Sequence, residues 1–488
     1  MTFTKLPFVI LCLVTYGLWL LARHDYRAKL AVMLAASLFF YGYNQWRLLF
    51  LISAYCLADW AVACWIERSR RPGWPLTLGV GFNLILLAFW KYTPMLLRTI
   101  AQVASALDLP APAGPPPWAV PLGISFYALT GIAYMVDVYR GGIPAERNFW
   151  RVTVHLIFFP RLMAGPILRP REFLSALHPD RIPDGPEHPQ EAMLLLARGY
   201  FKKLVLADRI ALAVEPFFLH VGDPATDGVW ALPYIYLYAF QIYCDFSGYT
   251  DIARGLGLMF GFRWPENFRL PYLAGSVEEF WRRWHITLST FLRDYLFLPL
   301  ASVWRRRGWR YVALLATLLL GGLWHGASWS FVLWGGLHGA YLLVNRLWIE
   351  SSLRERLRAR AGAAGRVGHL LSIALTFHCV CLGWCFFRLT ALSEGLACLR
   401  KWFVFDADKL FVGGSRDLSL WVLLGLYGTL AWLAHQAHGR AWLLGREPQA
   451  DSAPLARGFA WGTSVTLLLL AVLLAPGGET PPFIYFQF

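Results

Sequence analysis

Long apolar stretches recur along the whole of this chain, and they constrain its fold more than any other feature. Windows of about 18 or more apolar residues can cross a hydrocarbon core of roughly 30 Å as helices. Hydrophobic residues make up 57% of the 488 residues and charged residues only 15%, whereas a soluble domain carries about 25% charge. The chain is therefore predicted to be an all-α, polytopic membrane protein with little soluble mass.

The apolar stretches predict about 11 to 13 membrane spans or re-entrant helices. The first stretch is followed by further spans and lacks a small-residue cleavage site, so we expect it to be retained as a span. The predicted segments are 6–22, 30–46, 48–66, 76–100, 118–138, 152–168, 192–219, 230–262, 291–303, 311–348, 369–387, 418–434 and 459–475. Residues 169–190 are too rich in proline and charge to cross a membrane, and they are predicted to form a surface loop.

The basic residues indicate orientation in a membrane rather than binding to nucleic acid. The net charge is +15, but the basic residues are scattered in short loops between apolar stretches, as in cytoplasmic loops. The basic loops after the first, third and fifth spans are all predicted to be cytoplasmic, which places loop 108–117 outside. Basic clusters at 305–310 and 354–366 bracket segment 311–348, which is therefore expected to cross the membrane twice.

No metal or disulfide site is predicted from the cysteine pattern. The eight cysteines lie mostly inside apolar stretches. Their spacing matches neither a zinc site nor an extracellular disulfide framework. We interpret them as small apolar side chains.

His325 lies within an apolar segment, between the stretches 311–320 and 332–343. An ionisable side chain inside a hydrocarbon layer is costly and marks a functional site by default. Imidazole titrates near neutral pH and suits a general base, and Trp324, Trp329 and Trp334 are expected to form walls around it. His338 follows 13 residues later and is a candidate for the same cavity. The alternative for both histidines is a structural hydrogen bond between helices.

Two further clusters carry polar side chains. Segment 278–295 is amphipathic, and its residues Arg282, Arg283, Arg293 and Asp294 are candidates for binding a phosphorylated donor or a phosphopantetheine-type carrier at the cytoplasmic side. The alternative is an interfacial helix with snorkelling arginines. Asp245 and Asp251 lie in an otherwise apolar stretch. Three roles are open for them: to line a polar path, to pair with Arg254 or to cap helices.

The chain contains neither a Gly-x-Ser-x-Gly nucleophile motif nor a Walker-type phosphate loop. Direct attack by an acceptor hydroxyl is therefore the simpler mechanism for an acyl transfer centred on His325. A covalent step on the chain stays open.

The sequence resembles the membrane-bound O-acyltransferase (MBOAT) family, specifically its alginate O-acetyltransferase branch. The resemblance covers about residues 5–390 in order. The matching stretches are 122–127, 136–140, 159–160, 164–167, 202–203, 245–249, 257–262, 265–268, 281–285, 291–296, 323–327, 383–384 and 386–388.

The resemblance implies a multi-helix fold around a central funnel, in one membrane domain over residues 1–488. Within it, 1–151 would hold the N-terminal helices, 152–390 the catalytic core and 391–488 the C-terminal helices. His325 corresponds to the family's catalytic histidine and His285 to the histidine of its second motif. No bound cofactor is implied; the co-substrate would be a cytoplasmic acyl thioester such as acetyl-CoA. The protein would lie in the inner membrane and work with a periplasmic SGNH-type partner on a polysaccharide.

The leading hypothesis is thus an O-acetyltransferase for a secreted or cell-surface polysaccharide, with alginate and cellulose as the first polymers to test. Transfer of D-alanine to teichoic acid is the alternative within the family. A transporter of polysaccharide or lipid-linked sugar is an alternative of a different class. A lipid-linked glycosyltransferase is a third, based on the short stretch Asp406-Ala407-Asp408.

Overall fold

The computed structural model describes most of the chain before residue 405 and short pieces after it. The described residues are 1, 3–110, 114, 120–163, 165–226, 228–304, 306–352, 365–404, 421–422, 424–425, 428–429, 462, 465–470, 473 and 483–484. They form helices and loops, and they contain no strand. The predicted spans 418–434 and 459–475, and the stretch Asp406-Ala407-Asp408, lie largely or wholly outside the described residues.

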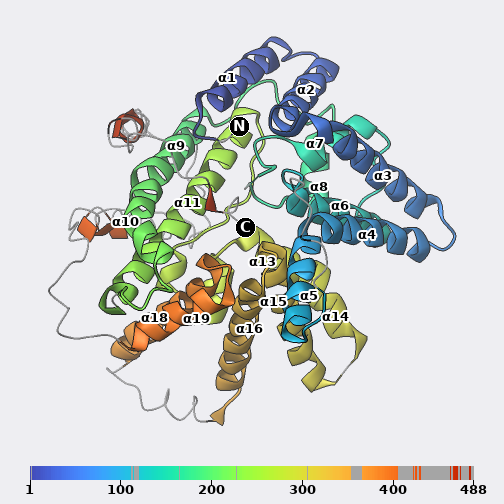
Figure 1. Cartoon of the computed structure of the whole chain (residues 1–488). Coiled ribbons are helices and arrows are strands. Elements are labelled where there is room, and N and C mark those ends of the chain that lie inside the picture. The colour runs from blue at the N-terminus through green and yellow to red at the C-terminus, as the bar shows by residue number, and fades with distance from the viewer. Residues whose placement is uncertain are drawn as a thin grey trace. The chain divides into compact units, whose positions relative to one another are not determined.

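The chain divides into two compact units, Met1–Ala192 with Leu256–Pro265, and Met193–Gly255 with Glu266–Phe488. In the first unit, α3, α4 and α6 pack together, as do α1 with α2 and α2 with α7 (Figure 1). Its elements are α1 (Leu6–Leu21), α2 (Tyr26–Gln45), η1 (Trp46–Leu48), α3 (Leu49–Arg68), α4 (Gly73–Leu87), η2 (Ala88–Tyr92), α5 (Thr93–Ala106), α6 (Ile124–Tyr139), α7 (Phe149–Ile157) and α8 (Pro170–Ala176), followed by α9 (Pro189–Tyr200), which continues into the second unit.

The second unit is built around the helix pair α15 and α16, which run side by side (Figure 1). Helix α16 also packs against α18 and α12. The elements are η3 (Phe201–Ala207), α10 (Asp208–Leu219), η4 (Gly228–Trp230), α11 (Ala231–Met259), η5 (Pro271–Leu273), α12 (Val277–Arg283), α13 (Ile286–Leu292), η6 (Arg293–Phe297), α14 (Leu298–Val303), α15 (Arg307–His325), α16 (Trp329–Ile349), α18 (Gly365–Arg388) and α19 (Leu392–Phe403).

Three helical stretches among the described residues are long and apolar enough to cross a membrane: Tyr26–Arg68, Gly73–Ala106 and Val367–Arg388. Leu6–Leu21 and Ile124–Tyr139 are shorter apolar helices. Large apolar side chains on these helices are exposed, for example Leu21 and Phe50, each 85% exposed. Exposed apolar surface on this scale fits contact with lipid rather than with water, and it confirms the prediction of an all-α membrane protein.

One local prediction was wrong, and the alternative of one interfacial helix over 278–295 does not hold. Residues 169–190 do not form only a surface loop. They contain α8, because the proline at its start pre-sets the first helical turn. The apolar side chains of Phe173, Leu177 and Ile182 are buried. The amphipathic segment 278–295 is not one helix. It breaks at His285, which separates α12 from α13 and has a φ of +42°.

Candidate active site

The helix pair α15–α16 places His325 at its turn. Helix α15 ends at His325, and Gly326 continues in an extended conformation before α16 begins at Trp329. The segment 311–348, which is predicted to cross the membrane twice, thus forms two helices that pack against each other. His325 is 6% exposed, so the base candidate is withdrawn from solvent at the point where the chain reverses.

Glycines allow the two helices to approach closely below this turn. A Cβ atom at Gly322 would lie 2.2 Å from the carbonyl oxygen of Phe331, and one at Gly335 would lie 2.2 Å from that of Leu318. Such contacts are too short for any side chain. The small residues near His325 thus serve helix packing, which is how closely approaching membrane helices commonly use glycine.

Aromatic rings enclose the imidazole of His325. Its ring centroid lies 4.8 Å from that of Trp324, 5.1 Å from that of Trp334 and 5.3 Å from that of Phe387. Trp324 and Trp334 are both buried. Trp329, which was expected to be a third wall, is 50% exposed at the start of α16. The wall comes instead from Phe387 of α18, which no spacing along α15 or α16 could indicate.

His285 lies in the same aromatic cluster. Its ring centroid is 6.4 Å from that of Trp324 and 4.6 Å from that of Phe246, and the side chain is fully buried. Both imidazoles therefore contact the indole of Trp324. The structure brings together the two histidines that the sequence analysis singled out, although 40 residues separate them along the chain.

Asn267 fixes the conformation and the tautomer of His285. Its Oδ1 accepts hydrogen bonds from Thr287, from the backbone N–H at 3.0 Å and the hydroxyl at 3.0 Å, and its backbone oxygen accepts one from the N–H of Ile286. His285 Nδ1 lies 3.3 Å from the same Oδ1. A carbonyl oxygen can only accept, so Nδ1 carries the proton and Nε2 presents a lone pair. Nε2 bonds to no described residue, so it is available to accept a hydrogen bond from a substrate.

His338 belongs to the neighbouring part of the cluster. Its ring centroid lies 4.9 Å from that of Trp334 and 5.3 Å from that of Trp281, and the side chain is fully buried. Neither imidazole nitrogen, nor the indole N–H of Trp281 or Trp334, has a hydrogen-bond partner among the described residues. Trp334 therefore links His338 to His325, and this part of the cluster keeps polar atoms available.

Helices α9 and α11 hold a buried ion-pair network. They cross closely, since a Cβ atom at Gly199 would lie 2.7 Å from the carbonyl oxygen of Gly248. Asp245 and Asp251 lie three residues to either side of Gly248, on one face of α11. The network consists of Lys203 with Asp245 and Asp208, each at 2.8 Å, and of Asp251 with Lys202 at 2.7 Å, Arg198 at 2.7 Å and Arg254 at 3.9 Å. Ion pairing thus accounts for both carboxylates.

Lys203→Met is expected to destabilise the protein, by about 3–5 kcal/mol, because it leaves two buried carboxylates facing each other without a cation. The measurement is thermal unfolding in detergent. Arg263→Gln is the matched control, since its ion pair with Glu191 is largely exposed and should contribute at most about 1 kcal/mol. Equal effects of the two substitutions would contradict a stabilising role for the network.

Each arginine of segment 278–295 pairs with a carboxylate close to it in the sequence. Arg282 pairs with Glu278 and Arg283 with Glu279, each one helical turn away. Arg293 donates to Asp294 at 2.6 Å, and this carboxylate raises the pKa of the guanidinium. Arg282 and Arg293 remain 73% and 59% exposed. An anionic ligand would therefore have to displace these carboxylates before it could bind the arginines.

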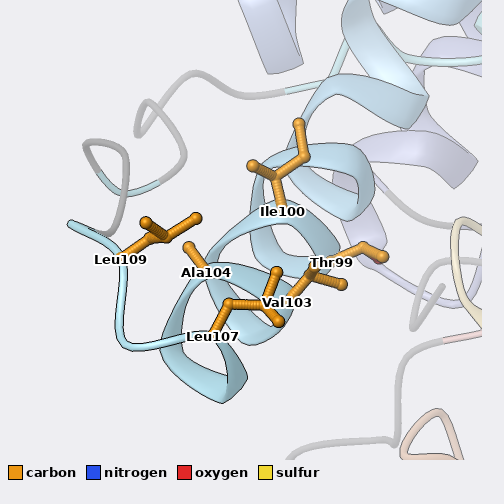
Figure 2. A pocket seen from close by; sticks show the side chains of 6 residues that line it. All are labelled: Thr99, Ile100, Val103, Ala104, Leu107 and Leu109. Atoms are coloured by element: carbon orange, nitrogen blue, oxygen red, sulfur yellow. The ribbon is translucent and has the colours of Figure 1, made fainter.

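A shallow cavity of about 260 Å³ lies on α5 of the first unit (Figure 2). Its lining is apolar, because the Thr99 hydroxyl donates to the backbone of Met95. The lining residues are Thr99, Ile100, Val103, Ala104, Leu107 and Leu109. It holds no titratable group, so we place no chemistry there.

Comparison with known proteins decides the family. The model of the membrane-bound O-acyltransferase family (MBOAT) matches residues 148–382. The probable alginate O-acetylases AlgI of Azotobacter vinelandii and Pseudomonas putida are 33% and 32% identical to this chain, each over 100% of both chains. The chain belongs to the membrane-bound O-acyltransferase family. It is an acyltransferase, as the sequence analysis predicted. A peptidoglycan O-acetyltransferase of Helicobacter pylori is 32% identical over 78% of this chain and 74% of its own.

Two features of this O-acyltransferase were not found from its sequence. Asn267 orients His285 from 18 residues away, and only its place in the stretch 265–268 could have drawn attention to it. Near the other end of the chain, the backbone N–H of Ile484 donates to Asp245 Oδ2 at 2.8 Å, and the ring of Phe483 lies 4.1 Å from that of Tyr249. The resemblance to the family ended at about residue 390, so it gave no reason to expect these contacts.

Proposed function

We propose that this O-acyltransferase transfers an acetyl group from a cytoplasmic thioester, such as acetyl-CoA, to a hydroxyl group, with His325 as general base. The observation that carries the proposal is the buried cluster in which His325 and His285 both contact Trp324. A base enclosed by rings is shielded from water, which favours transfer to a bound hydroxyl over hydrolysis of the thioester.

In the proposed step the acceptor oxygen attacks the thioester carbonyl carbon while His325 takes the hydroxyl proton. The new carbon–oxygen bond forms as the carbon–sulfur bond breaks, and the thiolate leaves and takes up a proton. His285 accepts a hydrogen bond at Nε2 and so positions one of the two substrates. The indole N–H groups of Trp281 and Trp334 are donors for the developing oxyanion or for a substrate carbonyl.

We propose a secreted polysaccharide of the alginate type as the final acceptor. The support is the near-complete coverage of the two alginate O-acetylases. Cellulose is a second polymer of this class, and the Helicobacter relative makes peptidoglycan a third polymer to assay. Transfer of D-alanine to teichoic acid remains the alternative within the family.

We further propose that the protein spans the inner membrane several times, takes its donor from the cytoplasm and passes the acetyl group to a periplasmic SGNH-type partner. The apolar helices of the first unit and α18 support membrane insertion. The acceptor proposed above is a secreted polysaccharide outside the cytoplasm, so the acetyl group has to cross the membrane.

The test is the ester content of the cell's exported polysaccharides in wild type, His325→Ala and His285→Ala strains, with the protein levels matched. Acetyl esters should fall to background with His325→Ala and fall substantially with His285→Ala. His178→Ala is the control, because this histidine is half exposed and its imidazole pairs with Asp180. Unchanged acetyl ester in both test strains, with lost D-alanyl ester instead, would favour the alternative.

Arg282→Gln and Arg293→Gln are expected to raise the KM for the thioester donor roughly threefold to tenfold, as exposed charge contacts are worth about 0.2–1 kcal/mol and somewhat more to phosphate. The KM for the acceptor should stay unchanged. Initial rates at varied donor and varied acceptor concentrations measure this, with Arg263→Gln as control. Equal changes in both KM values would contradict a donor-binding role.

A further inference from the structure

Arg161 is a buried cation that has no counter-ion in the described part of the chain. It follows α7 in the first unit and is 5% exposed. Its Nε and Nη2 atoms have no hydrogen-bond partner among the described residues. The guanidinium lies over the ring of Phe173, 5.5 Å from the centroid. A ring face compensates only part of the loss of hydration, because a cation–π contact is worth about 2 kcal/mol when desolvated, whereas burying an unpaired charge costs several kcal/mol.

Other cations of the same unit are paired. Lys29 is also almost fully buried, and it lies 2.8 Å from Asp184. Arg151 pairs with Glu146, Arg147 with Glu67, and Arg263 with Glu191. Carboxylates thus neutralise several cations of this unit, whereas no described carboxylate lies within ion-pair distance of Arg161.

His155 lies beside Arg161 and is also without a partner. It is fully buried in α7, and neither ring nitrogen has a hydrogen-bond partner among the described residues. Its ring centroid lies 5.8 Å from that of Phe173, the same ring that the Arg161 guanidinium covers. Two buried side chains with available N–H donors therefore meet at one aromatic ring.

The backbone holds Arg161 in this place. Its N–H donates to Phe158 at 3.1 Å, and its carbonyl oxygen accepts from the N–H of Gly165 at 3.1 Å. A Cβ atom at Gly165 would lie 2.4 Å from the Cα of Arg161, so the turn requires glycine. The turn thus fixes the backbone of Arg161, from which the side chain extends to the ring of Phe173.

We propose that Arg161 and His155 bind a compact oxyanion, a carboxylate or a phosphate, against the ring of Phe173. The planar guanidinium fork matches both groups with two parallel hydrogen bonds. The imidazole adds one N–H donor at its side. This site is separate from the histidine cluster of the second unit. The carboxylate would come from an acidic sugar and the phosphate from a phospholipid headgroup or a phosphorylated substrate.

The test is thermal unfolding of the purified full chain in a non-ionic detergent, with glucuronate or inorganic phosphate added at constant ionic strength. Each anion is compared with chloride and with the neutral methyl glucoside. The wild-type midpoint should rise by about 2 °C or more with at least one of the two oxyanions, and the more effective anion identifies the source. Mass spectrometry of the intact protein shows whether a phospholipid co-purifies.

Arg161→Met should abolish this rise and should itself raise the midpoint of the anion-free protein, because an apolar side chain of similar length replaces an uncompensated charge. Arg171→Gln, which removes an exposed arginine of α8, should leave the rise intact. A lower midpoint for anion-free Arg161→Met would show that Arg161 is structural and would overturn the proposal, as would an equal rise with chloride.

Arg161→Lys decides the case if the methionine variant does not fold. Lysine keeps the charge but not the planar fork, so the anion should bind at least threefold more weakly. Unchanged affinity would contradict the proposal. None of these measurements depends on acetyl transfer, so their failure is distinguishable from failure of the proposed function.

Discussion

His325→Ala should lower acetyl transfer by about 10²–10⁴-fold, the contribution expected of a general base, while the protein still inserts and folds. The side chain lies at the end of α15 and makes ring contacts to Trp324, Trp334 and Phe387. Its removal leaves those rings in place but removes the group that accepts the hydroxyl proton. Acetyl ester on exported polysaccharide, measured at matched protein levels, gives the result.

His325→Gln separates proton acceptance from packing. Glutamine fills much of the same space and can form hydrogen bonds, but it is not a base at neutral pH. It should therefore be as inactive as alanine. Activity above a tenth of wild type in either variant, with a normal unfolding midpoint, would remove His325 from the proposed role.

Gly335→Leu should separate α15 from α16 and abolish activity. A Cβ atom at this position would already lie 2.2 Å from the Leu318 carbonyl oxygen, and backbone cannot yield as a flexible side chain does. Overpacking of a close interface typically costs about 1–3 kcal/mol, and this contact is more severe than most. We expect a clear fall in the midpoint of thermal unfolding and a loss of acetyl transfer, since the turn that carries His325 depends on this crossing.

Gly336→Ala is the matched control for that substitution. The neighbouring glycine has room for a Cβ atom, with Leu319 Cδ2 at 3.4 Å as the nearest contact. Stability and activity should stay near wild type, and alanine also favours the helix more than glycine does, by about 1 kcal/mol. Similar losses in both variants would mean that the close helix approach at Gly335 does not explain the result.

The helix pair around His325 could be predicted because its evidence is local. Basic clusters flank one apolar segment of the length needed for two helices, and glycines next to a histidine mark the turn. The identity of the rings around His325 could not be predicted in the same way, since Phe387 comes from α18. Trp329 was expected in the wall for its proximity in sequence, yet the start of α16 leaves it half exposed.

The environment of His285 could not be predicted either, because nothing in the sequence marks a non-glycine residue that adopts a φ of +42°. The stretch 278–295 has the periodicity of a continuous amphipathic helix. Tertiary hydrogen bonds from Ile286 and Thr287 to Asn267 override that local preference and hold the chain in the left-handed region, which costs about 1–3 kcal/mol. Strain of this kind is commonly retained at functional sites, which supports the role proposed for His285.

The carboxylates of α11 show a similar limit. Asp245 and Asp251 were recognised as unusual in an apolar stretch, and pairing with Arg254 was one interpretation. The partners that lie closest are Lys203 and Lys202 in the π-helical segment η3 and Arg198 in α9. A π-helical turn changes which side chains share a face, so helical periodicity alone could not assign these pairs.

The most direct test of the central claim is acetyl transfer by the purified protein from labelled acetyl-CoA. Release of coenzyme A and formation of acetyl ester on alginate-type oligosaccharide are followed together. Wild type should form both products and His325→Ala neither. Free imidazole should partly restore both products in His325→Ala. Undiminished release of coenzyme A by His325→Ala would contradict the central claim, because the thioester would then react without the proposed base.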